Sequence, residues 1–278
     1  MPPRFPLLLL LPIALACQHS VPPQLSPQET GHVAQEMAAK AQSQLGAATS
    51  PPAPGLPSVV PEVLAHGSRN RPLVALTFDA CSTRDVSQYD ERVTRALVAA
   101  NAPATIFLGG RWAKEEAAHA RELAANPLFE LGNHTYTHPH LTAIQSEDRI
   151  RLEIERTQAE IHELTGIQAR LFRPPYGEYD QRVVRIAAQE GLKTIEYDLA
   201  SGDPDAHATK ERLVEWVLRK ARPGSIIVMH INHLRFHTSE ALPSIISGLR
   251  AKGFELVTVG RLLAESERLE RPVVFRKP

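Results

Sequence analysis

The sequence predicts an α/β protein in which parallel strands curl into a barrel. Short apolar runs alternate along most of the chain with longer stretches whose apolar residues recur at helical spacing, a pattern typical of repeated β–α units. About seven such units follow one another, as a barrel of this class requires. The balance of 43% hydrophobic and 22% charged residues in 278 is that of a globular protein. Because 31 Lys and Arg match 31 Asp and Glu, the chain lacks the basic excess of a nucleic-acid binder.

The first 70 residues differ in composition from the rest of the chain. More than half of the 23 prolines lie before residue 62. Arg4 and the apolar stretch behind it are typical of a signal peptide, which we expect at residues 1–16. Cleavage after Ala16 is compatible with an ordinary export signal or with a lipoprotein signal, and the cysteine that follows at once favours a lipid on Cys17. We expect residues 17–70 to form a disordered, Pro-rich tether that holds a folded domain off a membrane surface.

Strands are expected where short apolar runs end in polar or turn-forming residues. The first, Leu73–Phe78, is an almost uninterrupted apolar run, as a strand buried on both faces requires. The other strands are expected at residues 104–108, 129–132, 171–172, 192–197, 225–229 and 255–259.

Helices are expected between these strands. Ile150, Ile154 and Ile161 recur at helical spacing, and Gly166 is placed to end that helix, predicted over 146–164. The Ala/Glu-rich stretch 112–125 is stopped by Pro127. The remaining helices are expected at residues 91–100, 180–190, 209–221 and 239–252.

Side chains that can transfer protons, carry charge or bind metal follow five of the predicted strands. In a parallel barrel the catalytic groups lie on the loops after the carboxyl ends of the strands, so these residues should share one rim. A single residue of this kind is usually a turn, a cap or a buried histidine, but so many strand ends together indicate a functional site. They are Asp79, His134 with His138, Arg173, Asp198 or Asp203, and His230.

These residue types together suggest a hydrolase. His134 and His138 are four residues apart and can aim both imidazoles at one metal ion. Asp79 can accept a proton from water, and pairing with Arg173 would lower its pKa. His230 can act as the general acid, with Asp203 holding its far ring nitrogen. A base, a metal and an acid suit the hydrolysis of an acyl or amide bond.

The order of these motifs resembles that of the polysaccharide deacetylase family, the NodB-homology domain of the carbohydrate esterases. The resemblance covers about residues 70–263 and rests on five ordered motifs, each of which is weak alone. They are Thr77-Phe78-Asp79, His134-x-x-x-His138, Arg173-Pro174-Pro175-Tyr176-Gly177, a loop with Asp203, and Ile227-Val228-Met229-His230.

The resemblance implies a distorted (β/α) barrel that removes N-acetyl groups from amino sugars. By the resemblance Asp79 is the base, positioned by Arg173, and His230 is the acid, tuned by Asp203. His134 and His138 would hold a divalent metal, expected to be zinc. The backbone N–H of Tyr176 would help to bind the oxyanion, and Leu199 or Met229 would line a pocket for the acetyl methyl group.

The first motif departs from the family pattern, in which a second aspartate is the third metal ligand. Here that position is Ala80, so an aspartate restored there would be expected to strengthen metal binding. Asp79, Cys81, His140 or His237 could substitute as a ligand, or Asp79 could activate water without a tightly bound metal. Cys81 points to the same side as Asp79 in an extended chain, although a small buried residue beside the site is the favoured interpretation of it.

The fourth motif and the last loop also leave alternatives open. Ser201-Gly202-Asp203-Pro204 lacks the tryptophan that often follows the family's aspartate, and Asp198 competes with Asp203 as the partner of His230. Asn232 and His237, in the loop after His230, could contact substrate or could simply be solvated.

We therefore expect an exported, lipid-anchored carbohydrate N-deacetylase of the periplasm or cell envelope, acting on peptidoglycan or a poly-N-acetylglucosamine polymer. An amidohydrolase for a non-sugar C–N bond and a non-catalytic glycan-binding protein with a decayed metal site are the alternatives. The expected division is a signal peptide at 1–16, a tether at 17–70, a NodB-like domain at 71–265 and a tail at 266–278.

Overall fold

In a computed structural model of the chain, the structure describes residues 60–83 and 88–270. The expected signal peptide, the site of lipid attachment and most of the expected tether lie outside these residues. All the described residues belong to one compact unit, and the site lies within it.

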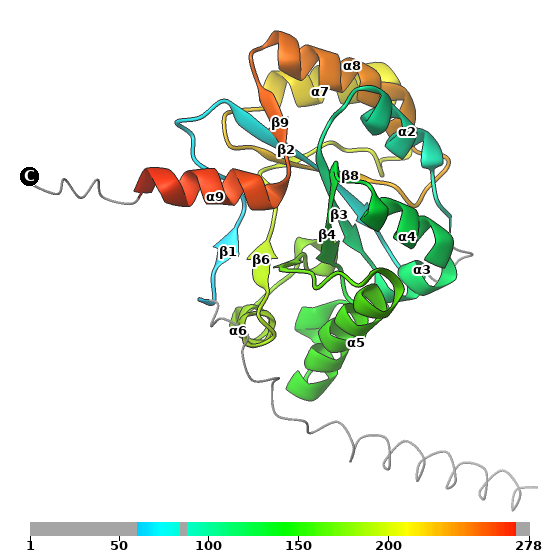
Figure 1. Ribbon diagram of the computed structural model, residues 1–278, viewed down its shortest axis with the longest axis vertical. Helices are drawn as coiled ribbons and strands as arrows, with labels where there is room; N and C mark the ends of the chain where they lie inside the picture. Colours follow the sequence, from blue (N-terminus) through cyan, green and yellow to red (C-terminus); the bar gives the residue numbers. More distant parts are fainter. Residues whose placement is uncertain (1–59, 84–87, 271–278) are drawn as a thin grey trace, which may run out of the picture. The chain divides into compact units, whose positions relative to one another are not determined.

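The described strands form one parallel sheet of nine members. Its order is β1-β6-β5-β4-β3-β2-β8-β7, with β9 beside the first half of β2 (Figure 1). The sheet curls, and His66, two residues after β1, forms an isolated antiparallel bridge with Ser225, directly before β8. This is the distorted (β/α) barrel that the sequence predicts. The strands are β1 Val63–Leu64, β2 Leu73–Ala80, β3 Ala104–Leu108, β4 Phe129–Asn133, β5 Leu171–Phe172, β6 Lys193–Ile195, β7 Leu199–Ala200, β8 Ile226–His230 and β9 Glu255–Val257.

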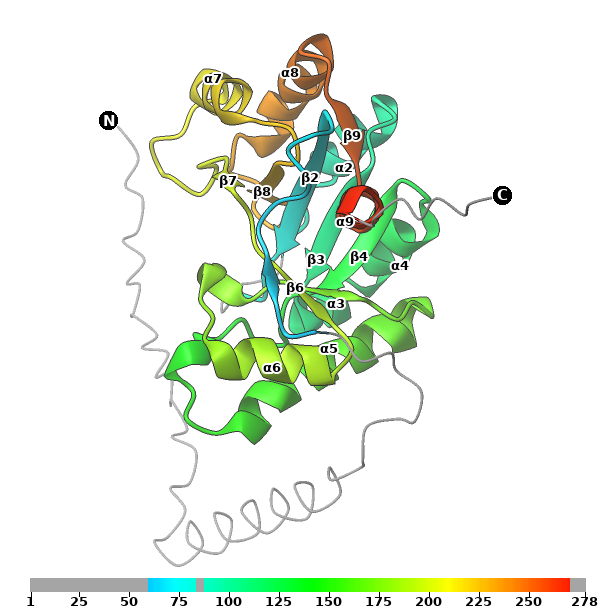
Figure 2. The same ribbon diagram turned by 90° about the vertical axis from the view of Figure 1, so that its left-hand side faces the viewer.

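Helices surround the sheet in two groups. In both views α2, α7 and α8 gather at one end, whereas α5 and α6 lie at the other (Figures 1 and 2). Among the described residues none of the helices is both long and apolar enough to cross a lipid bilayer. The helices are α2 Glu91–Ala99, α3 Gly110–Glu115, α4 Ala117–Ala125, α5 Glu147–Thr165, α6 Gln181–Gln189, α7 Lys210–Lys220, α8 Thr238–Ala251 and α9 Val259–Glu270.

Strand β2 is buried on both faces, and its two faces belong to different apolar clusters. Val74, Leu76, Phe78 and Ala80 join the large cluster that packs under helices such as α2 and α8. Leu73 and Ala75 join a second cluster, and Thr77 and Asp79 continue that face toward the end of the strand. The period of two along a strand therefore sends residues 77 and 79 into the barrel and residue 80 away from it.

Some boundaries differ from those expected. Strand β1 pairs with β6, so residues 63–64 of the expected tether belong to the sheet. The predicted helix 112–125 is two helices, because Glu116 leaves helical geometry with φ −105° and ψ 38°. Helix α9 continues to Glu270, past the expected domain end at residue 265.

Candidate active site

The carboxyl ends of four strands bring the expected side chains to one rim. Asp79 on β2 is directly opposite His230 on β8 in the sheet register. Along the sheet in the other direction, β4 ends at Asn133 and is followed at once by His134, whereas β5 is followed by Arg173. Asp79, His134 and Arg173 are all at most 5% exposed, so they can act only on groups that enter from the rim.

Asp79 and Arg173 form a buried ion pair. An Arg173 guanidinium nitrogen donates to Asp79 Oδ1 at 2.8 Å and to the hydroxyl of Thr77 at 2.8 Å, and the guanidinium lies over the ring of Phe107. Burial alone would raise the pKa of Asp79, but the charge of Arg173, together with its hydrogen bond, opposes this effect and the pKa is lowered. Asp79 is therefore held ionised, with Oδ2 left for another partner.

His134 is fixed in the tautomer that a metal ligand needs. Its Nδ1 lies 2.8 Å from the carbonyl oxygen of Arg173, and because a carbonyl only accepts, Nδ1 carries the proton. The lone pair of the neutral ring is then on Nε2. This atom lies 3.8 Å from Asp79 Oδ2 and 3.6 Å from the sulfur of Cys81.

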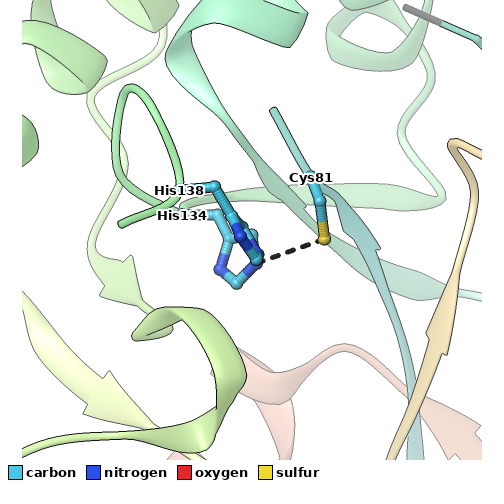
Figure 3. Close-up of side chains that lie close together, drawn as sticks. All are labelled: Cys81, His134 and His138. Carbon is cyan, nitrogen blue, oxygen red and sulfur yellow. Dashed lines mark hydrogen bonds between the residues drawn. The ribbon is translucent and has the colours of Figure 1, made fainter. Parts of the chain in front are cut away.

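Cys81, His134 and His138 form a three-residue cluster of potential metal ligands. One ligand atom from each lies within 4.8 Å of the others. Figure 3 shows the Cys81 sulfur, at the end of β2, facing the imidazole rings on the loop after β4. Burial alone would raise the pKa of the Cys81 thiol, but hydrogen bonds with His134, His138 and His230 lower it well below its usual value. The donor set fits a divalent cation, which would sit where these rings and the sulfur converge.

Position 80 is not part of this cluster. Ala80 is fully buried in the apolar cluster that includes Phe78 and Leu108. In an extended strand the side chain of residue 80 would start on the opposite face from His134 and His138, but the expectation that an aspartate there would strengthen metal binding stays a prediction.

His230 is paired with Asp203 and not with Asp198. The Nδ1 of His230 lies 3.0 Å from Asp203 Oδ1, and the backbone N–H of His230 donates to Asp203 Oδ2 at 2.7 Å. Ser201 and Thr238 also donate to the Asp203 carboxylate. Burial alone would lower the pKa of His230, but the Asp203 charge and hydrogen bond raise it well above the usual value. Asp198 is occupied elsewhere, by Arg69, Ser225 and the backbone of Ile226.

Backbone strain concentrates at the rim. Among the described residues four non-glycine residues have positive φ, and three of them lie here: Thr135, His138 and Tyr176. A non-glycine side chain in this region costs on the order of 1 kcal/mol or more and persists where the surroundings enforce it, as at ligand clamps and active sites. Tyr176, at φ 62°, is half exposed, and its hydroxyl donates to the carbonyl of His138.

Two connected cavities lie over the rim. The inner one, of about 330 Å³, is lined by Asp79, Cys81, His134, His138 and His230 among others. An outer groove of about 770 Å³ adds Arg111, His233 and Phe236. The residues shared by both are Cys81, His138, Tyr176, Pro204 and His230. A chain-like substrate can therefore lie in the groove with one substituent in the inner cavity.

Several expected residues serve other purposes. Leu199 and Met229 belong to the large apolar cluster and line neither cavity, whereas Tyr197, Pro204 and Val228 are among the residues that line the inner one. His140 stacks on Tyr176 and pairs with Glu178, and His237 pairs with Glu240 at the start of α8.

Two further buried groups lie near the site: Asn232, expected from the sequence either to contact substrate or to be solvated, and Glu196, which the sequence does not single out. Asn232 donates from Nδ2 to the carbonyl oxygen of Cys81 at 3.1 Å, and so fixes the backbone beside the sulfur. Glu196, directly after β6, has a carboxyl oxygen with no hydrogen-bond partner, and burial raises its pKa to about 7 despite the opposing charge of Arg173. No motif marks Glu196, since its role depends on which strands become neighbours.

Comparison with known proteins places this geometry in a family. A family model described as polysaccharide deacetylase matches residues 66–195. A peptidoglycan-N-acetylglucosamine deacetylase of Bacillus cereus is 30% identical over 204 residues, which cover 72% of this chain and 72% of that protein. The chain belongs to the polysaccharide deacetylase family.

Solved structures of this family resemble the chain closely. The peptidoglycan N-acetylglucosamine deacetylase Bc1960 matches with a TM-score of 0.67 and 28% identity, covering 73% of this chain and 92% of that one. BA3943 of Bacillus anthracis, described as a CE4 family pseudoenzyme, matches with a TM-score of 0.66 and 30% identity, covering 73% of this chain and 69% of that one. The family thus includes both a named deacetylase and a named pseudoenzyme, and the argument for activity rests on the side chains at the rim.

Proposed function

We propose that the protein is a hydrolase that removes N-acetyl groups from the amino sugars of a cell-surface glycan. One observation carries this proposal: Asp79 and His230 face the same cavity, and each has its own buried charged partner. A protein that only binds glycan has no use for two separately tuned proton-transfer groups, so their arrangement supports catalysis.

In the proposed mechanism Asp79 is the general base. Its Oδ1 is held by Arg173, and Oδ2 faces the cavity side of His134, where it can accept the proton of the attacking water. Arg173 keeps Asp79 ionised and fixes its rotamer. Arg173 acts on the reaction only through Asp79.

His230 is the general acid on the opposite side of the cavity. Asp203 accepts from Nδ1 and favours the protonated ring, so that Nε2 can deliver a proton to the leaving amine nitrogen. The backbone N–H of Tyr176 is the proposed donor to the oxyanion, at the mouth of the same cavity.

A divalent metal, zinc by preference, fits the ligands of this site. The Nε2 lone pair of His134 is free because Nδ1 is bound to a carbonyl, and His138 lies against it with ring centroids 4.9 Å apart. When bound, such an ion supplies polarisation of the amide carbonyl and of water. His134 and His138 would hold it.

We also propose that the protein is exported and works in the cell envelope, held at the membrane by a lipid on Cys17. The signal-like residues 1–16 and the named peptidoglycan deacetylases among its relatives support this location.

The test of the activity is acetate release from a panel of substrates. Purified protein is incubated with peptidoglycan, with N-acetylglucosamine oligomers and with N-acetyl-lysine as a non-sugar amide. Acetate from the glycans alone supports the proposal. Acetate chiefly from N-acetyl-lysine would favour a non-sugar amidohydrolase, and glycan binding without any acetate would favour a non-catalytic protein.

A further inference from the structure

We propose that Cys81 is a thiolate ligand of this metal site and that its sulfur makes the site prefer zinc to harder divalent cations such as Mn²⁺. The inference deepens the proposed function, because it concerns the same site. Metal binding can be measured without substrate, so the test of this inference is independent of the test of the proposed activity.

The backbone places the sulfur where a third ligand is needed. Residue 80 faces the apolar cluster, so the next residue that returns to the barrel side is Cys81. Asn232 holds the carbonyl oxygen of Cys81, and the side chain is 8% exposed and lines both cavities. The sulfur is thus fixed at the cavity wall beside the two histidines.

The distances fit a shared ion. A zinc–sulfur bond of about 2.3 Å and a zinc–nitrogen bond of about 2.0–2.1 Å at the tetrahedral angle place sulfur and nitrogen roughly 3.5 Å apart. The Cys81 sulfur and His134 Nε2 are 3.6 Å apart, and all three ligand atoms lie within 4.8 Å of one another. Small side-chain movements of His138 suffice to complete the set.

The site also keeps a place for a fourth ligand. A catalytic zinc site has three protein ligands and one open position. Cys81, His134 and His138 all border the 330 Å³ cavity, so water or the substrate carbonyl can reach an ion held by them. Asp79 borders the same cavity and stays free to act as the base.

The ligand chemistry sets the choice of metal. Thiolate and imidazole together suit zinc, whereas carboxylate and water suit Mg²⁺ and Mn²⁺. A site of two histidines and a cysteine should therefore bind zinc far more tightly than Mn²⁺. Replacing the sulfur by a carboxylate should bring the affinities for zinc and Mn²⁺ closer together.

Two other roles for Cys81 predict different results. As a nucleophile it would use His230 and Asp203 in a triad-like arrangement. As a small buried residue beside the site it would do nothing to the metal. In neither role should removal of the sulfur change zinc affinity.

The experiment is a metal titration of the full chain, freed of metal, in a Cys17→Ser background that leaves Cys81 as its one thiol. Co²⁺ replaces zinc as a spectroscopic probe, because a thiolate bound to Co²⁺ gives a near-ultraviolet charge-transfer band. Zinc and Mn²⁺ dissociation constants are measured by competition with a chelator. Cys81→Ser and Cys81→Asp are compared with the matched control His140→Ala, which removes a nearby histidine outside the cluster. Circular dichroism verifies that each variant is folded.

We expect the Co²⁺ band in the Cys17→Ser protein and in His140→Ala, and its loss in both Cys81 variants. Cys81→Ser should raise the zinc Kd at least about tenfold. Cys81→Asp should still bind zinc, with the ratio of the Mn²⁺ to the zinc Kd reduced at least about tenfold. Absence of the band from the Cys17→Ser protein, or an unchanged zinc Kd in folded Cys81→Ser, would overturn the proposal.

Discussion

The two carboxylate oxygens of Asp79 have different surroundings. Its carboxylate is buried, yet Arg173 and Thr77 are arranged so that one oxygen is held and the other faces the cavity. The Arg173 charge keeps the carboxylate ionised in a place where burial alone would favour the neutral acid. A base that is always ionised is ready to take a proton from water at any physiological pH.

Replacement of Asp79 by Asn should therefore abolish proton acceptance without changing shape. We expect kcat for acetate release to fall about a hundredfold or more. The variant loses the charge partner of buried Arg173, so its thermal unfolding is measured in parallel. Turnover close to wild type in a folded Asp79→Asn protein would remove Asp79 from the role of base.

Ala80 offers a second test at the residue scale. An aspartate here would place a carboxylate in the apolar cluster of Phe78 and Leu108, so Ala80→Asp should lower the free energy of unfolding by roughly 3–5 kcal/mol. The burial of Ala80 in this cluster predicts no decrease in the zinc Kd of the variant, whereas the family pattern predicts a decrease.

The matched variant Cys81→Asp, one position along, puts the same group on the cavity side and should be much less destabilised. Urea unfolding of both variants makes the comparison. An Ala80→Asp protein as stable as wild type, with tighter zinc binding, would mean that residue 80 faces the metal.

At the scale of elements, the end of β6 carries a group that couples stability to pH. Glu196 is 7% exposed, and burial raises its pKa to about 7, the Arg173 charge only partly opposing this. The folded state therefore binds a proton more tightly than the unfolded state does. Protonated Glu196 therefore contributes to the free energy of unfolding. This contribution is complete below the unfolded pKa of about 4.5 and is lost as the pH rises through the folded pKa of about 7.

Glu196→Gln should remove this dependence while keeping the shape of the side chain. Relative to wild type, the variant should gain roughly 1–3 kcal/mol in free energy of unfolding at pH 8 and much less at pH 5. The measurement is urea unfolding of both proteins at the two pH values. Parallel stability curves would show that Glu196 does not titrate in this range.

The long strands and helices could be predicted from the sequence because their patterns are local. The apolar run ending at Phe78 and the isoleucines of α5 define their elements unaided, and both are found within a few residues of the expected bounds. Strands β1 and β7 have two residues each, too few to show a period, and exist only because neighbouring strands accept their hydrogen bonds.

The site could be predicted as a set of residues but not as a geometry. Asp79, His134, Arg173 and His230 follow strands and so reach the same rim by topology. The family resemblance favours Asp203 as the partner of His230, but residue order alone leaves Asp198 open, because the Asp198 carboxylate is engaged by Arg69 only in the folded chain.

At the scale of the whole molecule, the proposed lipid on Cys17 would decide where the catalytic domain is held. If Cys17 carries the proposed lipid, Cys17→Ala should still be exported, because Ala16 remains available for cleavage, but should leave the membrane fraction. Fractionation of cells that express either protein makes the measurement. Wild type found in the soluble periplasmic fraction would rule out the lipid anchor.

The most direct test of the deacetylase proposal is the stoichiometry of the products on peptidoglycan. Hydrolysis of an N-acetyl group releases one acetate and leaves one free amine on the sugar. We expect wild type to produce acetate and new glycan amines in equal molar amounts, and Asp79→Asn to produce about a hundredfold less of both. A wild-type protein that binds peptidoglycan but yields no more acetate or amine than Asp79→Asn would contradict the account.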